Sequence, residues 1–143
     1  MGRFLVVCAS RTDQTRQIGE LIAEGIRMAG HEAVVKMVAD IKNEESLKGY
    51  DGYAFGSPTY HGDMIQSMKQ VLFMGERAEL ENKAGAAFGA YGWSGESAER
   101  IFNTMAHIFK MKMVSSPLML KASWVQGGMK AAQDYGKELA SLV

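Results

Sequence analysis

The sequence predicts an α/β fold, a doubly wound five-stranded parallel sheet in the strand order 2-1-3-4-5 with helices on both faces. Short apolar runs alternate along the chain with longer segments in which apolar residues recur at helical spacing. The first run, residues 4–9, is apolar throughout, which is typical of a central parallel strand buried on both faces. The chain has 143 residues, close to the commonest domain size, so we expect residues 1–143 to form a single domain.

Each apolar run predicts a strand and each periodic segment predicts a helix. Crossovers between parallel strands are right-handed almost without exception, which leaves few topologies. Strands are expected at residues 4–9, 32–37, 53–56 and 83–91 and, within 113–121, around Leu118-Met119-Leu120. Helices are expected at residues 15–29, from Met64 to near Gly75, at 98–109 and between Ala132 and Leu142, with a weaker one around 43–48.

The first helix shows the pattern most clearly. Ile18, Leu21, Ile22 and Ile26 give it one apolar face, and Gly30 follows it in the position usual for a helix-ending glycine. The later helices repeat this spacing. The fourth strand consists mostly of alanine and glycine, which indicates a tightly packed place in the sheet.

The composition excludes several classes of protein. Lys plus Arg and Asp plus Glu each number 16, so no overall charge attracts nucleic acid or an anionic membrane. The single cysteine, Cys8, allows neither an intramolecular disulfide nor a Cys-rich metal site. No stretch reaches the ~18 apolar residues of a membrane span. We expect a cytoplasmic monomer.

The loop after the first strand is the first candidate for function, since ligands of such sheets lie beyond the carboxyl ends of the strands, where the winding reverses. Its sequence is Ser10-Arg11-Thr12-Asp13-Gln14-Thr15. Three hydroxyls and the N–H groups of a helix N-terminus can bind an anion such as a phosphate. The alternative is that Thr12 or Thr15 simply caps the helix. The loop is neither a Walker loop nor a G-x-G-x-x-G fingerprint.

The loops after the third and fourth strands carry aromatic residues to the same crevice. They read Gly56-Ser57-Pro58-Thr59-Tyr60-His61-Gly62-Asp63 and Ala90-Tyr91-Gly92-Trp93-Ser94-Gly95-Glu96. Tyr60 and either Tyr91 or Trp93 could enclose a flat ring by stacking. The alternative is that each aromatic packs on its own loop.

Together these loops resemble those of the flavodoxin family, and the likeness extends over essentially the whole chain. Flavodoxins hold the phosphate of FMN with Ser/Thr-x-Thr-Gly-x-Thr after the first strand. Ser10, Thr12, Gln14 and Thr15 match that pattern, whereas Asp13 replaces its glycine. The resemblance implies a flavodoxin-like fold, FMN as cofactor, and phosphate binding by Ser10, Thr12 and Thr15. Asp tolerates a left-handed backbone better than most residues, so the turn can survive.

The other two loops extend the resemblance. It places Thr59 near the ribityl chain and the peptide of His61 near flavin N5. Residues 91–95 are similar to the flavodoxin domain of flavodiiron proteins, in which the tryptophan covers the ring. The residues expected to bind the cofactor are Ser10, Arg11, Thr12, Asp13, Gln14, Thr15, Pro58, Thr59, Tyr60, His61, Gly62, Ala90, Tyr91, Gly92, Trp93 and Gly95.

The function implied is electron transfer between redox enzymes, in which bound FMN does the chemistry and no side chain acts as a catalytic group. Redox partners would dock at the flavin edge, near Tyr60, His61, Asp63 and Trp93. Asp63 and Glu96 are the only obvious anions nearby, so we expect a less extreme potential than in strongly acidic flavodoxins. We also hypothesise that His61 makes the first reduction potential depend on pH near about 6–7.

Two other functions compete with this one. An FMN-dependent NAD(P)H:quinone-type oxidoreductase has the same fold but tends to be longer, with insertions that complete a substrate pocket. A receiver-like signalling domain needs an acidic cluster after the first strand and an acceptor aspartate after the third, where this chain has Ala9-Ser10 and Ser57-Pro58-Thr59. Metal binding by His31 or His107 is not expected, because the spacing of metal ligands is missing.

Overall fold

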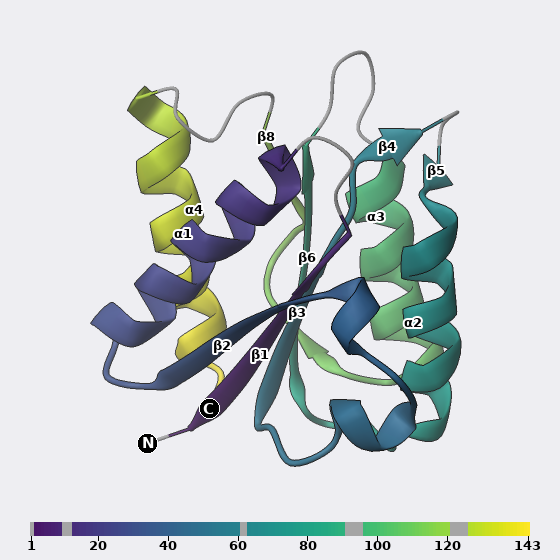
Figure 1. The fold of residues 1–143 in the computed structure, drawn as a ribbon. Helices are drawn as coiled ribbons and strands as arrows, with labels where there is room; N and C mark the ends of the chain where they lie inside the picture. Colours follow the sequence, from purple (N-terminus) through teal and green to yellow (C-terminus); the bar gives the residue numbers. More distant parts are fainter. Residues whose placement is uncertain (1, 10–12, 61–62, 91–95, 121–125) are drawn as a thin grey trace.

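The computed structural model describes residues 2–9, 13–60, 63–90, 96–120 and 126–143, with only the backbone described for Tyr60, Gln126 and Gly127. One parallel sheet lies between two layers of helices (Figure 1). Its strands are β1 (Arg3–Cys8), β2 (Glu32–Met37), β3 (Gly52–Gly56), β6 (Ala84–Ala90), β7 (Lys112–Met113) and β8 (Leu118–Leu120). The helices are α1 (Gln14–Met28), α2 (Gln66–Arg77), α3 (Glu96–Asn103) and α4 (Gln126–Ala140), with short helical segments η1 (Val38–Asp40), η2 (Glu44–Leu47) and η3 (Thr104–Ile108).

The strands lie in the order β2-β1-β3-β6-β7, and β8 pairs with the other end of β6. All of these pairings are parallel. Since β7 and β8 together take the place of a fifth strand, the predicted doubly wound order 2-1-3-4-5 is confirmed. The winding reverses at β1, which has β2 on one side and β3 on the other.

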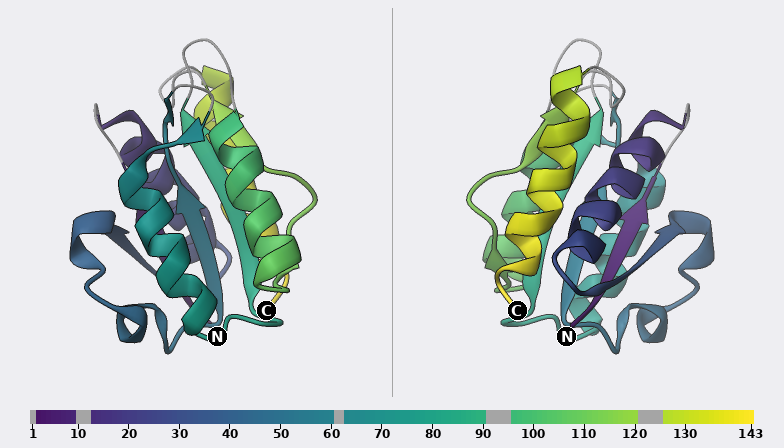
Figure 2. Two further views of the ribbon diagram at one scale, coloured as in Figure 1. Left: turned by 90° about the vertical axis from the view of Figure 1, so that its right-hand side faces the viewer. Right: turned by 90° about the vertical axis from the view of Figure 1, so that its left-hand side faces the viewer.

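The central strand β1 separates two apolar cores. Phe4, Val6 and Cys8 face α1 and α4, whereas Leu5, Val7 and Ala9 face α2 and α3. Figure 2 shows these two pairs of helices on opposite faces of the sheet. Residues 4–9 are fully buried, as expected for a strand covered on both faces. Burial also raises the pKa of the Cys8 thiol to about 12, which keeps it an apolar packing group at neutral pH.

Helices α1 and α4 approach each other unusually closely because each has a glycine at the contact. A Cβ atom at Gly25 would lie 2.0 Å from the carbonyl oxygen of Gln133, and one at Gly136 would lie 2.1 Å from that of Ile22. No other residue fits at either position without moving a helix.

The segment after β3 differs from the expectation. Met64 was expected to begin a helix, but it lies in β5 (Asp63–Met64), which forms a small antiparallel hairpin with β4 (Thr59–Tyr60). The helix α2 begins only at Gln66 and continues through Gly75 to Arg77. The helix thus ends near Gly75, as expected, and Gly75 itself allows a close contact, because a Cβ atom there would lie 2.9 Å from the ring of Phe109.

Two later elements also differ. The helix expected at 98–109 is an α-helix only up to Asn103 and continues as the π-helical segment η3. The strand expected around Leu118-Met119-Leu120 is confirmed as β8, and an interruption at residues 114–117 separates it from β7. The last helix ends at Ala140, so Leu142 lies beyond it.

Tyr135 fills the gap that this interruption leaves beside β6. Its side chain comes from α4 and is buried. The hydroxyl accepts the N–H of Ala87 at 3.2 Å and lies within donating distance of the carbonyl oxygens of Ala87 (2.9 Å) and Ser116 (2.8 Å). One side chain therefore replaces the hydrogen bonds that a strand residue would make with Ala87.

No helix in the described ranges is both long and apolar enough to cross a membrane. The same ranges contain no group of three or more His, Cys, Asp and Glu side chains placed to hold a metal ion.

We predict that Tyr135→Phe lowers the free energy of unfolding by about 2–3 kcal/mol, because both backbone groups of Ala87 lose their partner while they remain buried. Tyr53→Phe is the control, since the buried Tyr53 hydroxyl donates only to the carbonyl of Leu47 and its loss should cost about 1 kcal/mol. Urea unfolding of the variants measures both values. Equal losses of unfolding free energy in the two variants would show that Tyr135 does not replace the hydrogen bonds of a strand residue.

Candidate functional site

The carboxyl ends of the three central strands meet at one edge of the sheet. Cys8 pairs with Gly56, and Gly56 pairs with Phe88, so β1 and β3 end level with each other at that edge and β6 continues beyond them to Ala90. The chain leaves each strand there, at the upper end of the view in Figure 1. The three candidate loops of the sequence therefore start side by side.

The structure describes part of these loops. Asp13, Gln14, Thr15, Pro58, Thr59 and Ala90 are described, as is the backbone of Tyr60. Outside the described residues lie Ser10, Arg11, Thr12, His61, Gly62, Tyr91, Gly92, Trp93 and Gly95, together with the Tyr60 side chain. Their expected contacts with a cofactor remain predictions.

Thr15 lies in the first turn of α1 and is the clearest sign of an anion site. Its side chain is 1% exposed, and its Oγ1 atom has no hydrogen-bond partner within the described part of the protein. Buried hydroxyls without partners are rare because each forfeits its bonds to water. The first N–H groups of a helix also lack partners within the helix. A phosphate bound there would give hydrogen-bond partners to the Thr15 hydroxyl and to these N–H groups. The Thr15 hydroxyl does not cap the helix in the structure.

The backbone conformation of Asp13 shows how this turn forms without the glycine of the flavodoxin pattern. It adopts a left-handed backbone conformation, with φ of 70° and ψ of −8°, directly before α1. Its carboxylate makes no capping hydrogen bond and lies 3.7 Å from the guanidinium of Arg16. The turn therefore keeps the geometry that glycine would give it, and the added negative charge has a cation beside it.

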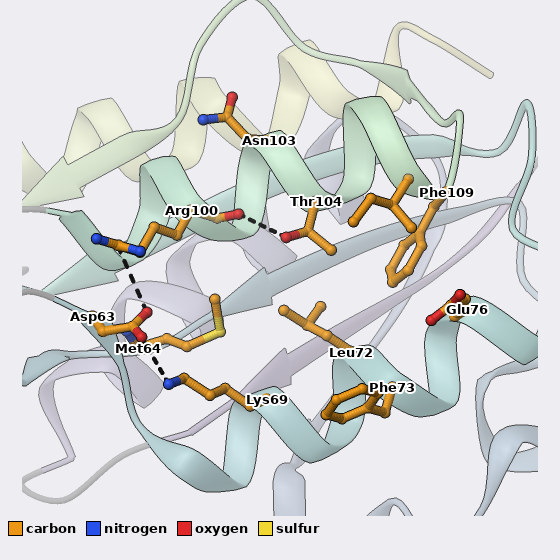
Figure 3. Close-up of a pocket in the computed structure, with 11 residues that line it drawn as sticks. Asp63, Met64, Lys69, Leu72, Phe73, Glu76, Arg100, Asn103, Thr104 and Phe109 are labelled. Carbon is orange, nitrogen blue, oxygen red and sulfur yellow. Dashed lines mark hydrogen bonds and ion pairs between the residues drawn. The ribbon is translucent and has the colours of Figure 1, made fainter.

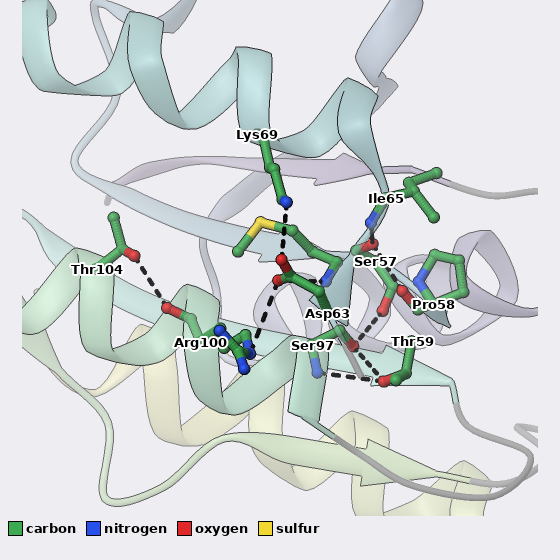
Figure 4. A network of polar contacts seen from close by, with 10 residues as sticks. Ser57, Pro58, Thr59, Asp63, Ile65, Lys69, Ser97, Arg100 and Thr104 are labelled. Carbon is green, nitrogen blue, oxygen red and sulfur yellow. Dashed lines mark hydrogen bonds and ion pairs between the residues drawn. The ribbon is translucent and has the colours of Figure 1, made fainter. Parts of the chain in front are cut away.

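A chain of hydroxyl groups ties the loop after β3 to the start of α3 (Figure 4). Thr59 Oγ1 donates to Ser97 Oγ at 2.9 Å, and Ser97 Oγ donates to the carbonyl of Ser57 at 2.9 Å. The backbone N–H of Ser97 returns a hydrogen bond to Thr59 Oγ1 at 3.2 Å. Ser57 and Ser97 are fully buried and Thr59 is half-buried, so the bond between Ser97 and the Ser57 carbonyl is shielded from water. Residues 59 and 97 border the two loops that carry the candidate aromatics, and the network fixes the start of β4 against the start of α3.

The same network includes backbone contacts that leave no room for larger residues. Ser57 Oγ accepts the N–H of Ile65 at 3.1 Å, which holds the far end of the hairpin. A Cβ atom at Gly89 would lie 2.5 Å from the carbonyl oxygen of Ser57.

Sequence reasoning missed Ser57 and Ser97 as positioning residues. A serine beside a predicted helix start could have drawn attention to Ser97, but nothing in the sequence pairs it with Thr59.

Asp63 of the hairpin lies between charged side chains of the two neighbouring helices, α2 and α3. Its carboxylate lies 2.7 Å from Lys69 Nζ of α2 and 3.8 Å from the guanidinium of Arg100 of α3. The hydrogen bond from Lys69, helped by the N–H of Met64 and by the charges of both cations, holds the pKa of this carboxyl below its usual value. Asp63 thus stays ionised but is compensated by two neighbouring cations, so it does not act as the isolated local anion suggested by the sequence.

Comparison with known proteins connects this geometry to a family. A family model described as Flavodoxin matches residues 6–136. The type A flavoprotein fprA of Rhodobacter capsulatus is 36% identical over 90 residues, which cover 63% of this chain and 20% of that protein. A flavodoxin of Clostridium saccharobutylicum is 29% identical over 113 residues, or 78% of this chain and 71% of that protein. This chain therefore spans only about a fifth of the length of the type A flavoprotein.

Solved structures show the same relationship. An archaeal flavodoxin superposes with a TM-score of 0.91 at 26% identity, covering 97% of this chain and 96% of the other. The flavodiiron protein of Giardia intestinalis has a TM-score of 0.88 at 22% identity, which shows a shared fold, and the match covers 36% of that chain.

The left-handed backbone of Asp13 gives a prediction about stability. Asp13→Ala should lower the free energy of unfolding by about 1 kcal/mol, because alanine tolerates this conformation poorly, whereas Asp13→Gly should cause no loss. Asp13→Asn is the matched control and should stay close to the wild type. Chemical unfolding measures all three. If alanine were as stable as glycine and asparagine, the turn would not require the left-handed conformation.

Proposed function

The chain belongs to the flavodoxin family of FMN-binding electron-transfer proteins, and we propose that it carries electrons between redox proteins through an FMN held at the carboxyl edge of β1, β3 and β6. The observation that carries the proposal is the buried, unpartnered hydroxyl of Thr15 at the N-terminus of α1. It lies where the family pattern requires a phosphate ligand. We further propose that residues 1–143 act as one FMN-binding unit.

The phosphate of FMN would be held by Ser10, Thr12 and Thr15 together with backbone N–H groups of the loop and of α1. Support comes from two features of the described residues. The Thr15 hydroxyl needs a partner, and a helix N-terminus favours negative charge. Asp13 does not spoil this site, because Arg16 lies beside its carboxylate.

The flavin ring would lie between Tyr60 and either Tyr91 or Trp93. The hydrogen bonds among Thr59, Ser97 and the Ser57 carbonyl support this arrangement, since they hold together the residues that border the two aromatic loops. Stacking on a flat ring depends on the separation of these loops. The remaining residues of the predicted set would form the walls of the site.

Bound FMN would supply the reversible uptake of electrons, and the protein would bind and orient it and exclude water from one side. No side chain is assigned as acid, base or nucleophile. Redox partners would approach the exposed edge of the ring beside Tyr60, His61, Asp63 and Trp93. Because Lys69 and Arg100 compensate Asp63, docking there would not depend on a strongly negative patch.

The proposal is tested by the visible absorption spectrum of the purified protein during stepwise reduction with dithionite. Flavin bands that pass through a one-electron, long-wavelength intermediate would support a carrier. Flavin bands that bleach in a single step, together with consumption of NAD(P)H by the protein alone, would instead indicate a quinone-type reductase. A colourless protein that does not take up added FMN would refute both.

Replacement of Thr15 by valine should separate cofactor binding from stability. We expect Thr15→Val to raise the dissociation constant for FMN roughly 10–100-fold, the loss of one hydrogen bond to a charged group. The apoprotein should be as stable as the wild type or slightly more stable, because a buried hydroxyl without a partner is replaced by a methyl group. Fluorescence titration with FMN and urea unfolding of the apoprotein measure the two effects.

Thr104→Val is the matched control for this prediction. Thr104 is also a helical threonine, but its hydroxyl donates to the Arg100 carbonyl at 2.9 Å, far from the edge of the sheet. The Thr104→Val variant should bind FMN with the affinity of the wild type. Unchanged FMN affinity in Thr15→Val would remove Thr15 from the site.

A further inference from the structure

A groove of about 450 Å³ runs between α2 and the α3–η3 segment, on the sheet face opposite α1 and α4 (Figure 3). Its floor is apolar, formed mainly by Leu72 and Phe109. The Asp63 carboxylate with its two cations closes one end, and Glu76 lies toward the other. Apart from Asp63 and its two cations at one end, the proposed electron-transfer role uses none of the residues that line this groove.

Two large apolar side chains are left exposed at its rim. Phe73 of α2 is 66% exposed and Ile108 of η3 is 59% exposed. The other largely exposed apolar residues of the described ranges lie elsewhere, for example Met28 at the end of α1 and Met129 of α4. Apolar groups gathered at a groove, in contrast to single ones scattered over a surface, mark an interaction site.

The order of side chains along α2 indicates what the groove binds. Lys69, Phe73 and Glu76 have the spacing i, i+4, i+7, which places them on one face of the helix. Lys69 and Glu76 are separated by roughly 10 Å along the axis. Figure 3 shows Lys69 and Glu76 toward opposite ends of the groove with Phe73 between them. The face therefore has a cation, a central aromatic ring and an anion in a line.

We propose that this groove binds a second copy of the chain, with the two α2 helices antiparallel about a two-fold axis near Phe73. A two-fold axis there brings Lys69 opposite the partner's Glu76 and Glu76 opposite the partner's Lys69. Each Phe73 then enters the other copy's groove, against Leu72 and Phe109. Such self-complementary contacts are the hallmark of a two-fold interface.

Two observations favour a second copy over another protein. The charged residues that line the groove, Asp63, Lys69, Glu76 and Arg100, sum to zero, so the groove selects neither a strongly acidic nor a strongly basic partner. When one copy is turned by 180°, its Lys69 and Glu76 exchange places, so each charge faces an opposite charge on the other copy. Lys69 can serve both copies, because its ammonium group has three N–H donors and one of them suffices for Asp63.

The expected association is weak. One face of two helices offers less than the ~1,200–2,000 Å² buried in stable interfaces. We had expected a monomer from the sequence, and the groove changes that expectation to a monomer–dimer equilibrium in the micromolar range or above.

Sedimentation-velocity centrifugation of the full chain, from about 10 µM to about 1 mM, tests the proposal. The wild type should shift from monomer toward dimer over this range. Phe73→Ser should raise the dissociation constant at least about tenfold, as expected for loss of a central aromatic residue. Met28→Ser, which removes an exposed apolar side chain of α1, should leave it unchanged. A protein that stays monomeric throughout, or equal effects of the two substitutions, would overturn the proposal.

A charge exchange tests the antiparallel arrangement itself. Glu76→Lys and Lys69→Glu should each weaken self-association, because like charges then meet at both ends. An equimolar mixture of the two variants should form a mixed dimer, since opposite charges then meet at both ends, with the original signs at one end and reversed signs at the other. Thermal unfolding first shows whether Lys69→Glu, which also removes a partner of Asp63, is folded; if it is not, the comparison of Phe73→Ser with Met28→Ser decides. A mixture of folded variants that associates no better than either alone would overturn the two-fold arrangement.

Discussion

The parallel pairing of β1 with both β2 and β3 is the constraint on which the rest of the structure depends. It makes β1 the point at which the winding reverses, so that α1 and α2 leave the same edge for opposite faces of the sheet. The two apolar cores follow, because residues 4–9 alternate between these faces. The site follows as well, since helices that diverge leave the strand ends uncovered.

Most of the fold could be predicted because its strands and helices carry strong local signals. The second strand was predicted with the bounds that it has, and Gly30 does adopt the positive φ of a helix-ending residue. The hairpin β4–β5 was missed because strands of two residues leave no periodic pattern. The strand around Leu118-Met119-Leu120 was predicted, but the separate strand β7 and the role of Tyr135 beside the gap were missed, because Tyr135 lies 48 residues from Ala87.

The candidate site shows the same division. Asp13 and Thr15 could be named as candidates because a loop between a strand and a helix is read directly from the sequence. The structure adds the left-handed backbone of Asp13 and the burial of Thr15, and their contacts with a cofactor stay predictions. The contacts of Ser97 with Thr59 and of Asp63 with Arg100 join residues 37 or more positions apart. Such contacts follow from packing of α3 against the hairpin, which only the structure reveals. They join the hairpin β4–β5 to α3 and compensate the charge of the Asp63 carboxylate.

The central claim is that one ligand bridges the loops after β1, β3 and β6. Amide correlation spectra of the ¹⁵N-labelled apoprotein, recorded during titration with FMN, test it most directly. The account predicts that the largest shift changes fall on the amides of residues 10–15, 57–62 and 90–96, in all three loops at once. The largest changes at the opposite edge of the sheet, in residues 29–31, 48–51 and 78–83, would contradict it.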